Sequence, residues 1–155
     1  YLSFCLAGCF GLKRFSSTLA YVNGVIHGQA EFCNWVKVTI KEVVDLFVVK
    51  FNKVWDENVT DVMAKEKGFK SWYLDNVLQD TSGVTGLELT RRIVGMAKVK
   101  DIVSIKNEND RVRAERICLT LAKEFILNRG QYKNGEQYVN TIEKVLESYP
   151  ENIVG

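Results

Sequence analysis

Apolar residues recur at helical spacing along much of the chain. From Glu31 to Trp55 they follow one another at steps of three and four residues, which is the pattern of one face of a long amphipathic helix. Many β-branched residues in this stretch lower its intrinsic helix propensity, but the spacing favours a helix over a strand. The predicted apolar face consists of Phe32, Val36, Ile40, Val43, Phe47, Phe51 and Val54.

The pattern downstream predicts shorter helices separated by polar breaks. A short helix is expected over residues 59–67 and another over 71–80. The Thr-Ser-Gly triplet at 81–83 is expected to end the second of these, and Ser82 or Thr85 can cap the next helix.

Two clear helices are expected in the C-terminal third. Several potential caps at 107–110 precede an apolar stripe at helical spacing, which Gly130 is expected to end. Asn134 is expected to cap the last helix, and Pro150 to end it. The whole pattern predicts a mainly α protein of about five to seven helices.

Composition and charge narrow the class of protein. The chain has 155 residues, of which 46% are hydrophobic and 26% charged, as in an ordinary globular domain or a piece of a larger protein. Its net charge of +2 gives no electrostatic case for a nucleic-acid or membrane partner. The apolar residues 1–12 are too short to span a bilayer, and Lys13 and Arg14 follow them, whereas a signal peptide carries its charges first. We therefore expect residues 1–12 to be buried, and the protein to be cytoplasmic.

Cysteine and histidine usage gives no indication of a metal site. Cys5, Cys9, Cys33 and Cys118 form no CxxC pair, and His27 is the single histidine. The cysteines are expected to be small buried residues in a reducing compartment. We also expect the three tryptophans in the core: Trp35, Trp55 and Trp72.

Motifs of a self-sufficient enzyme are absent from the sequence. It contains no GxxxxGK[ST] or GxGxxG phosphate loop and no GxSxG nucleophile elbow. The segment from His27 to Asn34 has the outline of a kinase catalytic loop, but Gln29 stands where an aspartate would act as base. A turn before the long helix is the simpler interpretation. No catalytic residue and no metal ligand are therefore predicted in this chain.

Arg91 and Arg92 are the candidate binding residues. They stand directly before an apolar run, and a guanidinium can bind phosphate or carboxylate through two parallel hydrogen bonds. Two such groups on a packed helix could hold a phosphoryl group. Glu88 lies three and four residues earlier, so ordinary salt bridges within the helix are the alternative interpretation.

The segment RRIVGMAKVKDIVSIKNENDRVRAERICLTLAKEFI resembles the C-terminal region of S-methyl-5-thioribose kinases. That family carries RRIVG followed by a V-x-D-x-x-S-I element and a helix containing AER and AK. The resemblance covers residues 18–147 and is most specific at 81–127. Residues 1–17 match poorly, and we expect the chain to form a single helical lobe.

The resemblance implies the helical C-terminal lobe of a protein-kinase-like, aminoglycoside-phosphotransferase-like fold. It implies transfer of a phosphoryl group from ATP, with magnesium, to 5-methylthioribose in methionine salvage. Arg91 and Arg92 match the twin arginines at the family's sugar site. The resemblance also implies a homodimer.

The family's nucleotide-binding lobe, catalytic aspartate loop and magnesium motif would precede this region and are not found in the 155 residues. We therefore expect a fragment, a truncated product or a remnant with little or no kinase activity by itself. The alternative is a stand-alone helical binding module that holds a partner through the apolar N-terminal segment.

Overall fold

The computed structural model describes residues 16–96 and 98–150, and every regular element in these two ranges is helical. The predicted mainly α fold is thereby confirmed. The expected burial of residues 1–12, with Cys5 and Cys9, lies outside the described residues. After a helix at 16–26, the elements are α2 (Ala30–Asn58), η1 (Met63–Lys65), α3 (Phe69–Val94), α4 (Lys100–Val103), α5 (Glu108–Leu127), η2 (Arg129–Gln131) and α6 (Gly135–Glu147).

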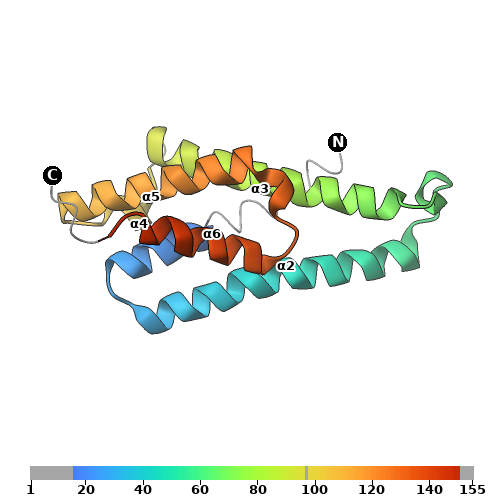
Figure 1. The fold of residues 1–155 in the computed structure, drawn as a ribbon, viewed down its shortest axis with the longest axis horizontal. Coiled ribbons are helices and arrows are strands. Elements are labelled where there is room, and N and C mark those ends of the chain that lie inside the picture. The colour runs from blue at the N-terminus through green and yellow to red at the C-terminus, as the bar shows by residue number, and fades with distance from the viewer. Residues whose placement is uncertain (1–15, 97, 151–155) are drawn as a thin grey trace.

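The two longest helices, α2 and α3, run antiparallel and form a long hairpin (Figure 1). Helix α5 packs along the C-terminal part of α3, and α6 lies between α5 and α2 (Figure 1). The helix at 16–26 lies near the start of α2. At the end of the hairpin that carries η1, neither α5 nor α6 covers α2 and α3 (Figure 1).

The core lies where these helices meet. Of the predicted stripe on α2, Val36 and Ile40 are buried, and Val43, Phe47 and Phe51 are half-buried. Cys33 and Val44, which were not predicted, are also buried. The stripe is wrong at its two ends, since Phe32 and Val54 are exposed. Residues of α3, α5 and α6 complete the core, including Val77, Leu89, Ile93, Ala114, Ile117, Cys118, Leu121, Phe125, Tyr138 and Ile142.

The predicted break at 81–83 is wrong, because α3 continues without interruption from Phe69 to Val94. The hydroxyl groups bond within or across the helix instead of ending it. Thr81 and Thr85 each donate to the carbonyl four residues back, and Ser82 donates to the carbonyl of Phe125 on α5 at 2.9 Å. The small side chains therefore serve close helix packing rather than a turn.

The start of α3 depends on a glycine. Gly68 has a φ of +88°, in the left-handed region that favours glycine, and it immediately precedes the helix. The expected helix at 59–67 is wrong, since only the single 3₁₀ turn at Met63–Lys65 forms there. The chain thus reverses direction between α2 and α3 in a short exposed connection.

The junction between α2 and α6 is close and polar. A Cβ at Gly135 would overlap the backbone of Lys41, so α6 begins almost in contact with α2. Asp45 accepts a hydrogen bond from the Gly135 amide at 3.1 Å. Asn134 caps α6 as predicted, and its side chain and that of Gln137 form a reciprocal capping box.

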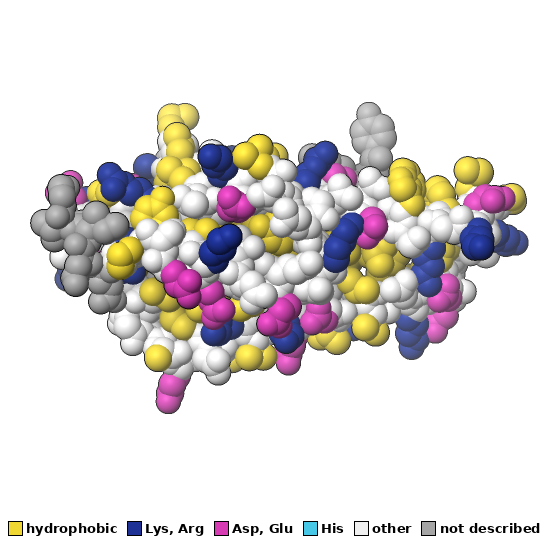
Figure 2. All heavy atoms as spheres, viewed as in Figure 1, with side chains coloured by type: hydrophobic (Ala, Val, Ile, Leu, Met, Phe, Trp, Pro, Cys, Tyr) yellow, Lys and Arg dark blue, Asp and Glu magenta, His cyan; other side chains and the backbone are white. Residues whose placement is uncertain are grey.

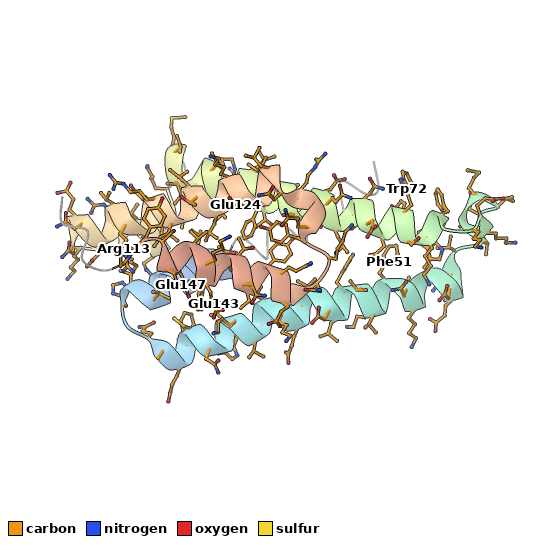
Figure 3. The ribbon with its side chains drawn as sticks, in the orientation of Figure 1. Phe51, Trp72, Arg113, Glu124, Glu143 and Glu147 are labelled. Atoms are coloured by element: carbon orange, nitrogen blue, oxygen red, sulfur yellow. The ribbon has the colours of Figure 1, made fainter. Side chains whose placement is uncertain are left out.

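Aromatic side chains join the hairpin at its far end. Trp55 and Phe51 on α2 pack against Tyr73 on α3, with ring centroids 5.2 and 6.0 Å apart. Figure 3 shows Phe51 between the two helices and Trp72 on the outer side of α3. The expectation that all three tryptophans are buried is wrong, because Trp35 is 63% and Trp72 59% exposed.

Candidate functional site

Arg91 and Arg92 lie in the last turn of α3, the end at which the helix carries partial negative charge. Positive side chains are favoured at this position. The side chain of Arg91 is 52% exposed and that of Arg92 is 29% exposed, so solvent reaches both. The pair therefore stands at the edge of the packed core, where a ligand from solution can reach the guanidinium groups.

Glu88 contacts both arginines. Its two carboxylate oxygens accept hydrogen bonds from Arg91, from Nε at 3.0 Å and from Nη2 at 2.7 Å. One of the same oxygens, Oε2, lies 3.9 Å from Nε of Arg92. Hydrogen bonding to Glu88 raises the pKa of Arg91 above its ordinary value. The salt bridges that the sequence offered as an alternative are thus present.

The salt bridges leave binding capacity on the arginines. A guanidinium has five N–H donors, and Glu88 accepts from two nitrogens of Arg91. The three side chains together carry one net positive charge. Such a group can hold an anion such as a phosphate, and its one carboxylate, that of Glu88, is engaged by the arginines. Chemically, the arrangement supports binding and charge stabilisation rather than proton transfer.

The helix end that carries the arginines is firmly anchored. Leu89 and Ile93, on either side of the pair in sequence, are buried. One turn earlier Gly86 packs directly on α5, since an added Cβ there would lie 2.6 Å from the carbonyl oxygen of Ala122. The backbone positions of Arg91 and Arg92 are therefore set by the interface between α3 and α5.

Two residues after the pair, Gly95 and Lys98, complete the helix end, and no motif in the sequence indicated a role for them. The Gly95 amide donates to the carbonyl of Arg91 at 3.0 Å. Nζ of Lys98 donates to the carbonyl of Ile93 at 2.8 Å, which places another positive charge at the helix terminus. Glycine and lysine shortly after a helix end are a recognisable signal, but the sequence suggested no partner for them.

The kinase-like segment from His27 to Asn34 is a turn followed by α2, as expected. His27 is exposed, and Gly28 has a φ of +65°. Gln29 precedes α2 without a side-chain hydrogen bond to the helix end. These residues show no arrangement of a catalytic loop.

The described parts of the chain show no metal-binding cluster, and the face seen in Figure 2 is not dominated by one sign of charge. Residues 16–96 and 98–150 hold no group of three or more His, Cys, Asp or Glu side chains that could bind a metal ion. Lys and Arg side chains alternate with Asp and Glu over the face in Figure 2. No helix in the same residues is long and apolar enough to cross a membrane.

The known proteins to which the chain is similar include kinases. No protein-family model matches the chain. Over 87 residues the chain is 37% identical to a protein of Bacillus cereus (strain G9842), 36% to one of Bacillus anthracis (strain CDC 684 / NRRL 3495) and 34% to one of Bacillus mycoides (strain KBAB4). Each of these three relatives is named methylthioribose kinase.

The similarity is partial. It spans 56% of this chain and 22% of the length of each relative, so the chain corresponds to a minor part of those proteins. This agrees with the resemblance seen in the sequence motifs and supports a relationship to that kinase family.

Proposed function

We propose that this chain is the sugar-binding, C-terminal part of a methylthioribose kinase. In this proposal residues 18–147 form the helical lobe of a protein-kinase-like fold. The whole enzyme transfers a phosphoryl group from ATP to 5-methylthioribose and yields ADP and 5-methylthioribose 1-phosphate, a step of methionine salvage in the cytoplasm. The observation that carries the proposal is the pair Arg91 and Arg92 on an anchored helix end, in a chain similar to proteins named methylthioribose kinase.

The arginines have a clear role in such a reaction. Phosphoryl transfer depends mainly on positioning and on stabilising the charge of the transferring group, and arginine suits both tasks. Arg91 and Arg92 would bind the sugar or its new phosphate. The proposal assigns the base, the magnesium ligands and the nucleotide contacts to a preceding lobe, so ATP and magnesium bind outside this chain.

Substitution of each arginine by lysine tests the proposal, because lysine keeps the charge and removes the planar fork. The protein is used in the form that its source cells make, and turnover of 5-methylthioribose with magnesium ATP is measured. Arg91→Lys and Arg92→Lys should each lower kcat/KM by at least about 10²-fold, since an arginine at a transferring phosphoryl group contributes about 10³–10⁵ in rate. The KM for ATP should stay unchanged.

A matched control is Arg116→Lys, on an exposed position of α5. It should leave kcat/KM within about twofold of the wild type, as is usual for a surface substitution. The proposal is wrong if the protein does not phosphorylate 5-methylthioribose, or if the substitutions of Arg91 and Arg92 change turnover no more than this control does.

The size of the native protein separates the proposal from the alternative of a stand-alone binding module. An antibody against residues 107–147 should detect a band well above 17.7 kDa in extracts of the source cells. A band at 17.7 kDa, together with no turnover of 5-methylthioribose, would favour the binding module. Sedimentation equilibrium of the same protein tests the homodimer.

A further inference from the structure

Glu88 stands out among the acidic residues because one carboxylate serves two arginines. It binds Arg91 through both oxygens at 3.0 and 2.7 Å, and its Oε2 lies 3.9 Å from Arg92. Arg91 and Arg92 carry like charges on adjacent residues, so without a shared counter-ion they would repel each other. The carboxylate therefore favours an arrangement in which the two guanidinium groups stay close together.

The burial of Glu88 distinguishes it from an ordinary surface partner. Its side chain is 18% exposed. By contrast, Glu108 pairs with Arg111 at the same spacing of three residues but is 82% exposed, and its oxygen lies 3.9 Å from the guanidinium. Exposed pairs of that kind contribute little, because water and salt screen them. The contact of Glu88 with Arg91 is shorter and bidentate, and the carboxylate is better shielded than that of Glu108, so it restrains the guanidinium that it binds. The contact with Arg92 is as long as that of the exposed pair, and it differs only in the shielding of the carboxylate.

The anchoring of α3 gives Glu88 a fixed origin. The residue follows Gly86, which packs on Ala122 of α5, and it precedes the buried Leu89. The carboxylate is thus attached to the best-packed part of the helix, while the arginines reach outward from its last turn. The packed core therefore fixes the position of Glu88, and Glu88 in turn restrains the guanidinium groups.

We propose that Glu88 is a positioning residue for Arg91 and Arg92. It holds the Nε and Nη2 edge of Arg91, which directs the remaining N–H donors of that group toward the anion. It also offsets the repulsion between the two guanidinium groups. This inference rests on the proposed function, and it assigns to Glu88 a role that requires no contact with the substrate.

Positioning has a distinct kinetic signature. Glu88→Gln keeps the size of the side chain and removes its charge, so both arginines gain freedom while the site becomes more positive. Ground-state attraction for an anionic ligand then remains, but the alignment needed in the transition state is lost. We expect kcat to fall roughly 10- to 100-fold, the scale of effect produced by small misplacements of aligned groups, with the KM for the sugar unchanged within about threefold.

Glu88→Asp and Glu108→Gln are the matched comparisons. Aspartate keeps the charge with a shorter reach, so Glu88→Asp should recover a substantial part of kcat. Glu108→Gln removes an exposed partner of a single arginine at the same spacing and should leave kcat unchanged. Thermal unfolding is recorded for each variant, and the Arg91 Nε–H signal is followed by ¹⁵N NMR. In Glu88→Gln we expect faster exchange of that proton with water and an unchanged helical circular dichroism signal.

The outcomes separate this inference from the proposed function. If Arg91→Lys and Arg92→Lys lower turnover but Glu88→Gln leaves kcat within threefold of the wild type, only the positioning role is overturned. The positioning role is also overturned if Glu88→Gln loses activity in parallel with its thermal stability and Glu88→Asp recovers neither. If the arginine substitutions have no effect, the proposed function fails and the role of Glu88 fails with it.

Discussion

Single small residues decide how closely α3 approaches α5. Gly86 faces the Ala122 carbonyl and the Ile126 side chain, and an added Cβ would lie 2.6 and 2.7 Å from them. Gly83, one turn earlier, has only the Cδ of Arg129 at 3.9 Å, which is ordinary contact. Two glycines of one helix thus have different neighbours, and the same substitution should have opposite effects at the two positions.

Gly86→Ala should destabilise the protein by about 1–3 kcal/mol, because overpacking of a tight interface outweighs the higher helix propensity of alanine. Gly83→Ala is the control and should stabilise the protein by about 0.5–1 kcal/mol, since alanine fits there and loses less entropy on folding. Urea unfolding of the two variants measures both effects. A Gly86→Ala variant as stable as Gly83→Ala would contradict the close approach.

Burial also determines the chemistry of Cys118. The residue is completely buried on α5, and burial raises the pKa of its thiol to about 12. The folded protein therefore keeps this proton at pH values where the unfolded chain, with a thiol pKa of ~8.5, has released it. Because the folded state binds more protons, the contribution of this thiol to stability is fully present below pH ~8.5. It is lost as the pH rises toward 12.

Cys118→Ala removes this dependence. The variant should be less stable than the wild type at pH 7, because it leaves a cavity. The difference in free energy of unfolding between wild type and variant should shrink by about 1.4 kcal/mol for each pH unit above ~8.5. Urea unfolding between pH 7 and 10, with a reductant present, measures the trend. A difference that stays constant with pH would show that the thiol titrates equally in both states.

At the scale of elements, the helix ends are supported unequally. Asn107 accepts hydrogen bonds from two amides at the start of α5, and Asn134 forms the capping box of α6. Helix α2, the longest of the described helices, begins at Ala30, and the side chain of the preceding Gln29 makes no capping hydrogen bond. Its position is determined instead by the burial of Val36 and Ile40 and by the contacts of its middle part with α6.

Asn134→Ala should therefore cost about 1 kcal/mol, the usual effect of removing an N-cap side chain. Gln29→Ala is the matched control at a helix start without a cap, and its effect should stay within about 0.5 kcal/mol. Both values come from urea unfolding. Equal losses in the two variants would mean that the capping box contributes nothing specific.

At the scale of the whole molecule, the two ends of the α2–α3 hairpin differ in support. None of residues 45–76 is buried. The helices are joined there by aromatic contacts of Phe51, Trp55, Phe69 and Tyr73 and by the partly exposed ion pair between Lys70 and Asp56, at 2.8 Å. The opposite end is covered by α5 and α6 (Figure 1). Regions with few buried contacts open at lower free energy than the core.

Amide hydrogen exchange should reveal this difference. Amides of residues 51–58 and 69–76 should exchange through a local opening, well before those of residues 114–125. Phe51→Ala should speed exchange at 51–58 and 69–76 and also at 114–125, because loss of the Phe51 contacts lowers the free energy of both the local opening and global unfolding. Phe125→Ala, in the buried core, should speed exchange at 114–125, which depends on global unfolding, and leave the locally opening segments 51–58 and 69–76 almost unchanged. Equal protection of both regions in the wild type would contradict the proposed opening.

Local signals account for the parts of the fold that could be predicted. The caps Asn107 and Asn134 and the apolar stripe of α5 act within a few residues, so the sequence is enough to place α5 and α6. The same reasoning failed at Ser82, because a Thr-Ser-Gly triplet is typical both of a helix end and of a close helix contact. Only the presence of Phe125 opposite Ser82 distinguishes the two.

At the candidate site, too, some features could be predicted from the sequence and others could not. Arg91 and Arg92 are recognisable in the sequence, and so is the spacing that allows Glu88 to reach them. The sharing of one carboxylate between both arginines, and its shielding from water, could not be read from spacing, because exposed and buried pairs have the same spacing.

By itself the sequence determined the helical class, the starts of α5 and α6, the candidate arginines and the resemblance to methylthioribose kinases, since each depends on residues close together in the chain. The tertiary structure alone decided that α3 is continuous, that Trp35 and Trp72 face solvent, and that Gly86 and Gly135 lie at points of closest helix approach. These features depend on contacts between residues far apart in sequence, and burial and steric fit exist only once the helices have packed.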